Sequence, residues 1–279
     1  MKISTSVEKV MKGIKDTYAV KKEIGSPVVS GFPSLDKIIT GFYPWSLTLI
    51  AGSIDTGETS FCLSVARNVA LSQKKKVAIV SIQYSIRDIT FFLLSQQGRI
   101  AIDKIYNCFL YKDEWPRLEN ASSEISKAHI FIYDYPFLTI ERLWKISRNI
   151  VKENRIDLLI VDGFQHINNK FDHLWLLHRL INEIHIPIIF GINIPSQYRR
   201  KNFRPNLSDL KKWGIDNSHS ENVIFLYQES ICKFDLNRIV ELIIYKGAQP
   251  PKKVKLEFIP EYMIFKETQS TPICKKFRL

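Results

Sequence analysis

The chain has 279 residues, about twice the usual length of one domain, and its hydrophobic content of 45% is enough to bury a sizeable core. This composition excludes disorder for most of the chain. Lys and Arg number 40 against 28 Asp and Glu, so the formal net charge is +12. Such a surplus indicates a polyanionic partner, nucleic acid before an anionic membrane, unless the protein is simply basic.

The first predicted element is a helix that stands apart from the rest. Hydrophobic residues recur among lysines at three- and four-residue spacing in residues 1–24, which predicts an amphipathic helix. The Gly-Ser-Pro sequence at 25–27 then ends it. Residues 1–27 are therefore treated as a linker helix.

From Leu47 onward, short β-branched runs alternate with helical stretches. Strands are predicted at 47–52, 77–82, 129–134, 157–162 and 186–192, with helices from Thr59, Ile86, Ile140 and Asp172 between them. This alternation predicts an α/β fold with a parallel sheet covered on both faces. Closely spaced strands at 221–227, 238–246, 253–258 and 262–267 predict an antiparallel extension of the same sheet. The chain is thus read as one domain at 28–267, followed by a basic tail at 268–279.

A phosphate-binding loop follows the first buried strand. The sequence Gly52-Ser53-Ile54-Asp55-Thr56-Gly57-Glu58-Thr59-Ser60 has the G-x-x-x-x-G-K-[ST] spacing between a strand and a helix, with Glu58 at the lysine position. Its candidate binding residues are Gly52, Asp55, Gly57, Glu58, Thr59 and Ser60.

The substitution at Glu58 reverses the charge of the loop. At about 4 Å and an effective dielectric constant near 20, an attraction of roughly 4 kcal/mol becomes a similar repulsion, and Asp55 adds a second negative charge. Losing the attraction alone costs on the order of a thousandfold in affinity. Glu58 also suits the first turn of a helix, so a purely structural role is open to it.

Further short motifs occur in a fixed order around this loop. They lie at 31–36, 41–42, 97–100, 113–118, 132–134, 138–140, 160–162 with Gln165, 204–205 and 208–210. Together these motifs resemble the C-terminal motor domain of DnaB-type replicative DNA helicases across residues 28–267. The resemblance implies a RecA-like P-loop NTPase fold and ATP-driven unwinding by a hexameric ring on single-stranded DNA.

This sequence departs from the family's pattern at residues that the family uses for ATP hydrolysis. The resemblance implies a catalytic glutamate where this chain has Gln83, and a glutamine cannot act as a base. It implies a sensor glutamine at Asn193, and a lysine–arginine pair, given to the neighbouring subunit's nucleotide, that here reads Lys246 and Ala248. An arginine finger is worth about 10³–10⁵ in rate.

Two groups of the family's site remain. Asp162 stands at the Walker B position, and Thr59 supplies the hydroxyl on the magnesium side. Capping of the next turn is the plainer alternative for Asp162.

A basic segment after the fifth strand is a candidate DNA contact. Residues 196–205 combine cations, which track phosphates, with aromatic rings, which stack on bases. The resemblance implies a central-channel DNA loop here; a solvated basic loop is the alternative. The second channel loop, between Gln165 and Asp172, is shorter than the resemblance implies, so weaker DNA binding is expected. The candidate contacts are Arg199, Arg200, Lys201 and Arg204.

No metal site, disulfide or membrane segment is expected. His166, His173, His178 and His185 have no spacing that places a pair on one helical face, and the four cysteines form no CxxC motif. Free cysteines favour a cytoplasmic location. The N-terminus lacks a secretory signal, and no apolar run approaches the roughly 20 residues of a membrane span.

Three functions remain open. The first is a non-catalytic DnaB homologue, with no nucleotide cofactor, that acts in replication as a DNA-binding or regulatory component. The second is an active helicase using ATP and magnesium, in which Lys246 or another cation replaces the missing lysine. The third is an interaction module. Residues 1–24 are expected to mediate assembly, with copies of the chain or with a true helicase, and folding back on their own domain is the alternative.

Overall fold

The computed structural model describes residues 7, 11, 26–53, 55–167, 174–194, 204–212, 215, 217–218, 220–228 and 238–268. Val7 and Met11 are helical. The rest of residues 1–25 lies outside the described residues, so the predicted linker helix is tested at these two positions alone. The tail beyond Thr268 also lies outside them.

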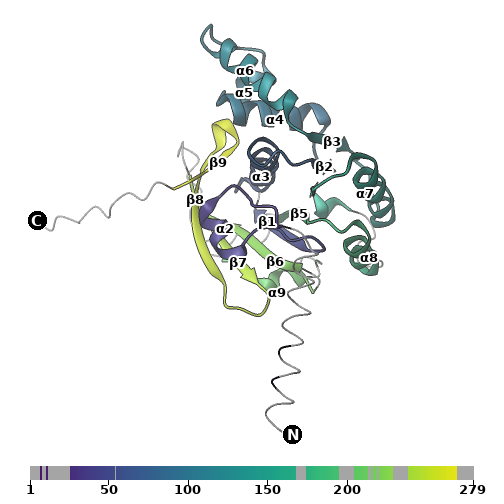
Figure 1. Cartoon of the computed structure of the whole chain (residues 1–279). Coiled ribbons are helices and arrows are strands. Elements are labelled where there is room, and N and C mark those ends of the chain that lie inside the picture. The colour runs from purple at the N-terminus through teal and green to yellow at the C-terminus, as the bar shows by residue number, and fades with distance from the viewer. Residues whose placement is uncertain are drawn as a thin grey trace, which may run out of the picture.

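One sheet of nine strands forms the centre of the molecule, in the order β3-β2-β4-β5-β1-β6-β7-β8-β9 (Figure 1). In this order, neighbouring strands from β3 to β6 pair in parallel, and neighbouring strands from β6 to β9 pair antiparallel. Their bounds are β1 Leu47–Ser53, β2 Val77–Ser81, β3 Ile130–Asp134, β4 Leu158–Asp162, β5 Ile188–Ile194, β6 Ser220–Tyr227, β7 Arg238–Lys246, β8 Lys252–Ile259 and β9 Ile264–Glu267.

The predicted antiparallel extension is confirmed by the pairs β6–β7, β7–β8 and β8–β9, but β6 also joins the parallel part of the sheet, which was not predicted. It pairs in parallel with β1, from Leu47 opposite Ser220 to Gly52 opposite Leu226. The reason is the long connection from β5 to β6, which returns the chain to the same end of the sheet as a parallel pair requires. The tight turn between β7 and β8 then allows antiparallel pairing.

Helices cover both faces of the sheet (Figure 1). Helices α2, α3 and α4 pack on one face and α7 and α8 on the other, while α5 and α6 extend from α4 at one end. The bounds are α2 Pro33–Ile39, α3 Glu58–Ser72, α4 Ile86–Gly98, α5 Ile102–Tyr106, α6 Glu114–Lys127, α7 Ile140–Asn154, α8 Leu174–Ile184 and α9 Leu207–Lys212, with short 3-10 helices η1 Phe164–His166 and η3 Pro260–Tyr262. Within the described ranges, no helix has the length and apolar character needed to cross a membrane.

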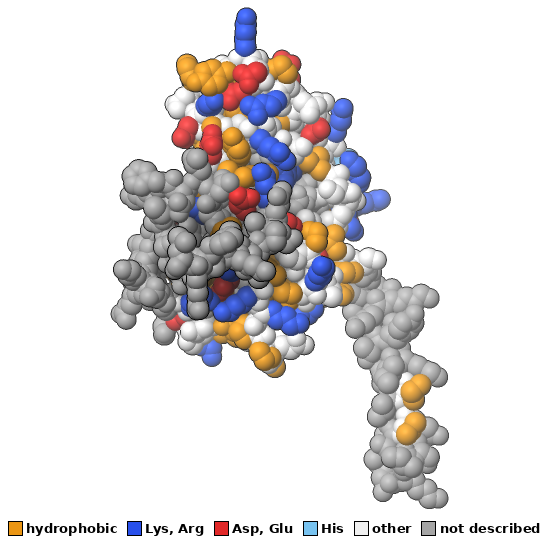
Figure 2. All heavy atoms as spheres, turned by 90° about the vertical axis from the view of Figure 1, so that its left-hand side faces the viewer, with side chains coloured by type: hydrophobic (Ala, Val, Ile, Leu, Met, Phe, Trp, Pro, Cys, Tyr) orange, Lys and Arg blue, Asp and Glu red, His pale blue; other side chains and the backbone are white. Residues whose placement is uncertain are grey.

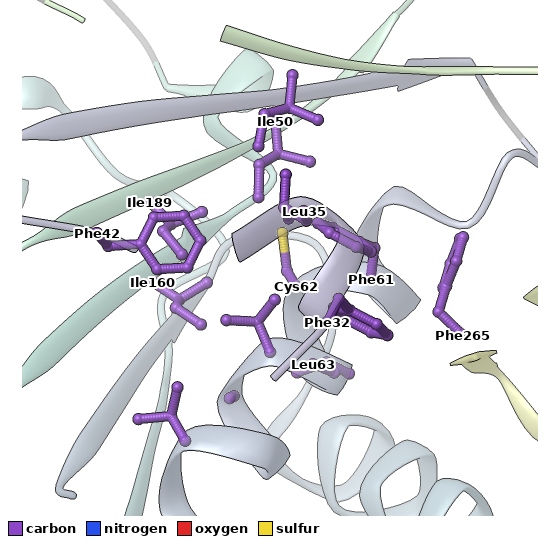
Figure 3. Packing of buried hydrophobic residues seen from close by; sticks show 14 of the residues in the cluster. Phe32, Leu35, Phe42, Ile50, Phe61, Cys62, Leu63, Ile160, Ile189 and Phe265 are labelled. Atoms are coloured by element: carbon purple, nitrogen blue, oxygen red, sulfur yellow. The ribbon is translucent and has the colours of Figure 1, made fainter. Parts of the chain in front are cut away.

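Two hydrophobic cores follow from the alternation of side chains along the strands. In β1, Leu49 and Ala51 face the core under α7 and α8, whereas Ile50 faces the core under α3. Figure 3 shows the second core, where Ile50, Ile160 and Ile189 of three adjacent strands meet α3. Helix α3 is thereby fixed against the middle of the sheet, and its first turn lies where β1 ends.

Candidate functional site

A cavity of about 600 Å³ opens at the carboxyl ends of β1 and β5. Ligands of open α/β sheets bind at this edge. The loop after β1 supplies one wall, and β8 with η3 supplies another. Of the residues predicted from sequence, the cavity is lined by Asp55, Gly57, Glu58, Thr59, Ser60, Gln83 and Asn193.

The loop between β1 and α3 has the backbone of a phosphate loop. Gly57 precedes α3 in the left-handed region with φ 82°, and a Cβ there would lie 2.7 Å from the Phe258 ring, so glycine is required. Thr56 donates a hydrogen bond from Oγ1 to the Ser53 carbonyl at 2.7 Å and closes the turn. Helix α3 therefore presents its N-terminus to the cavity, as predicted.

Glu58 turns inward instead of projecting into solvent. Its side chain is 5% exposed and extends over β5 at Gly191, where a Cβ would overlap Glu58 Oε1. The same Cβ position lies 3.3 Å from Asp162 Oδ1, so the two carboxyl groups are close neighbours. Burial, and then the charge of Asp162, raise the pKa of Glu58 well above its ordinary value.

Asp162 ends β4 as a fully buried carboxyl group. Thr59 donates a hydrogen bond from Oγ1 to Asp162 Oδ1 at 2.8 Å, and Asp162 Oδ2 has no hydrogen-bond partner among the described residues. Burial raises the pKa of Asp162 to about 6, and the Thr59 hydrogen bond opposes that shift. The side chain thus contacts α3, in agreement with the Walker-type pairing and not with the capping alternative.

Gln83 and Asn193 lie on the cavity wall. Gln83 donates from Nε2 to the Tyr84 hydroxyl at 3.4 Å. The Asn193 backbone N–H donates to Gln165 Oε1 at 2.9 Å, while its own side-chain oxygen, Oδ1, is buried without a hydrogen-bond partner in the described structure. The structure therefore brings both predicted residues to the same cavity as Glu58 and Thr59, whereas Asp162 is buried behind Thr59 and does not line the cavity.

Comparison with known proteins agrees with the resemblance found in the sequence. A model of the DnaB-like helicase C terminal domain matches residues 27–267. The chain belongs to this family. It is 28% identical over 253 residues to the replicative DNA helicase DnaB of Geobacillus stearothermophilus, covering 85% of this chain and 56% of that protein. The replicative DNA helicase DnaC of Bacillus subtilis is 25% identical over 253 residues with the same coverage. The chain thus spans about half the length of the curated relatives it matches.

Solved structures confirm the RecA-like fold. A DnaB-like replicative helicase, studied with its interactions with primase, superposes with a TM-score of 0.79 at 24% identity, covering 94% of this chain and 66% of that one. A KaiC-like protein from Pyrococcus horikoshii OT3 gives a TM-score of 0.57 at 17% identity, covering 86% and 97%.

Lys246 and Ala248 stand at the positions of the lysine–arginine pair that the resemblance assigns to the neighbouring subunit's nucleotide. Both lie away from the cavity of their own chain. Lys246 ends β7 and donates from Nζ to the Ile39 carbonyl at 2.9 Å and to Thr40 Oγ1 at 3.3 Å, at the carboxyl end of α2. Ala248 is exposed in the turn that follows. Lys246 therefore does not replace the loop lysine within its own chain.

Arg238 is the cation that sequence reasoning missed. It begins β7, lines the cavity and donates from Nη1 to the Asp55 carbonyl at 3.2 Å. Its Nε atom is buried without a hydrogen-bond partner in the described part of the chain. No motif marks this arginine, because only the pairing of β7 with β6 brings it beside the loop.

The candidate DNA segment is only partly described. Arg199, Arg200 and Lys201 lie outside the described residues. Arg204 forms an ion pair with Glu241 and stacks over the Tyr227 ring at 4.8 Å. On the face shown in Figure 2, Lys and Arg side chains are spread over the described surface and not collected in one patch.

Of the four histidines, the two whose side chains the structure describes, His166 and His185, lie in different surroundings. His166 lines the cavity and His185 packs against Trp45, with ring centroids 5.1 Å apart. His173 and the His178 side chain lie outside the described residues. Among the residues described, no group of three or more His, Cys, Asp or Glu could hold a metal ion.

Proposed function

We propose that this chain is a DnaB-type domain that no longer hydrolyses ATP and that serves DNA replication as a non-catalytic, DNA-binding or regulatory component. The observation that carries the proposal is the position of Glu58, the first residue of α3, whose buried carboxyl group lies beside Asp162. Family membership supports the connection to replication.

The loop does not fit a triphosphate with its magnesium ion. A phosphate at the start of α3 needs the backbone N–H groups there and a cation above them. Glu58 offers a carboxyl group instead, and at about 4 Å a charged carboxylate repels each phosphate charge by roughly 4 kcal/mol. Protonation of Glu58 would remove the repulsion, but the attraction of a lysine would still be missing, which costs on the order of a thousandfold in affinity.

The remaining substitutions act against turnover. Gln83 stands at the cavity wall but has no basic oxygen to activate a water molecule. Ala248 offers no guanidinium group to a neighbouring site. Repair of the loop alone would therefore leave hydrolysis weak.

Arg238 is the observation that favours the second candidate, an active ATP-dependent helicase. Its guanidinium group lies within hydrogen-bond distance of the loop at Asp55, so it is the described cation best placed to substitute for the lysine. Its hydrogen bond goes to the loop backbone, however, so in the proposed function Arg238 holds the loop and binds no phosphate.

Assembly and DNA binding complete the proposal. Residues 1–24 would join copies of the chain or dock on a true helicase, and the basic segment at 196–205 would give weak, salt-sensitive binding to single-stranded DNA. Both elements lie largely outside the described residues, so their support is the sequence pattern together with family membership.

A calorimetric titration of the full chain with ATP and magnesium tests the proposal. We expect no binding at micromolar concentrations and no phosphate release above that of an Asp162→Asn variant. A dissociation constant in the micromolar range, or turnover that Asp162→Asn abolishes, contradicts it.

A further inference from the structure

A cluster of cations lies at the edge of the sheet opposite the cavity. The first residues of β3, β2 and β4, which are Ile130, Val77 and Leu158, lie side by side in the sheet. The cavity opens where parallel strands end, so these amino ends face away from it. Six cations stand in the helix ends and connections that enter these strands, and we call them the basic edge: Lys74, Lys75, Lys76, Lys127, Lys152 and Arg155. We propose that the basic edge binds the phosphate backbone of double-stranded DNA.

Hydrogen bonds hold these separate parts of the chain together as one surface. The Val77 N–H donates to the His129 carbonyl at 2.9 Å, and the Asp157 N–H donates to the Lys76 carbonyl at 2.8 Å. Lys76 Nζ also donates to the Asn154 carbonyl at the end of α7, at 3.1 Å. Neighbouring strands lie about 4.8 Å apart, so the three strand entries span about 10 Å. A span of this size, widened by long side chains, is comparable with the major groove of a duplex, about 12 Å wide.

The basic edge carries a concentrated positive charge. In segments 73–76, 127–129 and 152–157, six cations stand against the two carboxylates of Glu153 and Asp157, so the formal charge is +4 of the chain's +12. Asp157 is already engaged, because its Oδ2 accepts from the Lys76 N–H at 2.8 Å and its Oδ1 lies 3.9 Å from Lys75 Nζ. The four remaining cations are exposed and form no ion pair with a described residue: Lys74, Lys127, Lys152 and Arg155.

Two of these four cations stand where a helix end usually has glycine or asparagine. Lys74 follows α3 and Arg155 follows α7, and both have a left-handed backbone, with φ 55° and 53°. Their charged groups make no ion pair in the described part of the chain. The fold therefore does not use these charges, which leaves them free for a ligand.

The lack of exposed apolar side chains selects the kind of polyanion. Among the described residues, none of the large hydrophobic side chains that are exposed belongs to the basic edge. A single-strand site combines cations with aromatic rings that stack on bases, and a membrane surface takes up apolar side chains. A duplex requires neither, because its backbone carries one charge per about 1.7 Å of axis and binds cations whatever the sequence.

The basic edge is separate from the basic segment at 196–205. That segment follows the carboxyl end of β5, on the side of the cavity. The five residues of β4 place about 16 Å between the two edges of the sheet. The choice of DNA as the duplex rests on the proposed role in replication, but the cations of the basic edge do not line the cavity.

Fluorescence anisotropy of the full chain with a short labelled DNA duplex of mixed sequence, at several salt concentrations, tests the proposal. The edge variant replaces the four free cations by glutamine: Lys74→Gln, Lys127→Gln, Lys152→Gln and Arg155→Gln. The control variant removes the same charge from four other exposed lysines: Lys37→Gln, Lys112→Gln, Lys252→Gln and Lys255→Gln.

The unmodified chain should bind the duplex, and its affinity should fall as salt rises. With one phosphate per free cation, the edge variant should lower the slope of log K against log salt by about 3.6. Its affinity at low salt should fall at least about tenfold, because the phosphate contacts supply most of such binding. The control variant should keep most of the slope, and both variants should keep the melting temperature of the unmodified chain.

Four results would overturn the proposal. The first is the absence of salt-sensitive duplex binding by the unmodified chain, which no folding defect can imitate. The second is an equal loss in the edge and control variants, which would reflect net charge alone. The third is duplex binding that the edge variant keeps and that joint replacement of Arg199, Arg200 and Lys201 by alanine removes. The fourth is binding to phosphatidylserine vesicles that the edge variant loses, without any duplex binding, which would identify a membrane surface.

A parallel titration with ATP separates this proposal from the proposed function. Duplex binding at the basic edge together with micromolar ATP binding overturns the proposed function and supports the basic edge. No ATP binding and no duplex binding overturns the basic edge alone.

Discussion

Glu58 occupies the space that a side chain on Gly191 would fill. Gly191 lies in a central strand, opposite Asp162 on β4 and Ile50 on β1, where a glycine lowers strand stability and is unusual. The missing Cβ opens the position taken by the Glu58 carboxyl group, which would otherwise be forced toward the cavity. The two residues therefore form one structural unit, although they are far apart in the sequence.

The first prediction tests that unit. Gly191→Ala should lower the free energy of unfolding by about 1–3 kcal/mol, because the added Cβ overlaps Glu58 Oε1. In a Glu58→Ala background the same change should cost less, with a coupling of at least about 0.5 kcal/mol in a double-mutant cycle from urea unfolding.

Gly247→Ala is the control for this cycle, since a Cβ there meets no atom within 4 Å. Its effect should not depend on residue 58. Equal costs of Gly191→Ala in both backgrounds would show that the two residues do not interact.

The second prediction concerns the loop charge. Glu58→Lys should recover some ATP binding and little hydrolysis, because the change repairs the electrostatics but leaves Gln83 and Ala248 in place. Calorimetry and phosphate-release assays measure the two effects, with Glu58→Gln as the neutral control. Robust ATP turnover by Glu58→Lys alone would mean that Gln83 and Ala248 do not prevent hydrolysis.

The order of elements was predictable from sequence, because it depends on local patterns. Glycines, β-branched runs and the spacing from Gly52 to Thr59 predicted the strand, loop and helix that the structure confirms. The parallel pairing of β6 with β1 was not predicted, since the spacing of strands along the chain does not show from which end of the sheet the chain enters a strand.

The side-chain arrangement of the site was harder to predict from the sequence. The inward turn of Glu58 depends on the empty space at Gly191, and the position of Arg238 depends on sheet pairing. Neither is a local property. An arginine at the start of a strand gives no signal of its own, and one glycine in a buried run is ambiguous between a bulge, a bend and a close approach.

The third prediction uses Arg238 to separate the two candidate functions. If Arg238 only holds the loop, Arg238→Ala should remove one hydrogen bond to the Asp55 carbonyl and lower the free energy of unfolding by about 0.5–1.5 kcal/mol. Nucleotide binding, which the proposed function expects to be absent in the unmodified chain, should stay absent after the change. The helicase alternative instead requires measurable ATP binding that Arg238→Ala removes and Arg238→Lys partly keeps.

The fourth prediction concerns single-stranded DNA. Binding should be weak and should fall with salt, because cations on the 196–205 segment would release counterions from phosphates. Each contact contributes about 0.7 to the slope of log K against log salt for single strands. Joint replacement of Arg199, Arg200 and Lys201 by alanine should therefore lower the slope by about 2.

Arg204 is the internal comparison for this series. It is already paired with Glu241 and stacked on Tyr227, so Arg204→Ala alone should change the slope least. Fluorescence anisotropy at several salt concentrations measures both variants. Binding that ignores salt, or that survives the triple change, would identify the segment as a solvated basic loop.

The fifth prediction concerns residues 1–24. A lone amphipathic helix of this length is marginal in water and must bury its apolar stripe, which carries Val7 and Met11. Both side chains are about half exposed, at 52% and 47%, so the helix buries this part of its stripe on another surface if it mediates assembly. Deletion of residues 1–24 should then convert an oligomer to a monomer in a solution mass measurement, with little change in melting temperature. An unchanged monomer with a lowered melting temperature would instead show that the helix folds back on its own domain. The variant Met11→Lys places a charge on the apolar stripe and should reproduce whichever of the two outcomes the deletion gives.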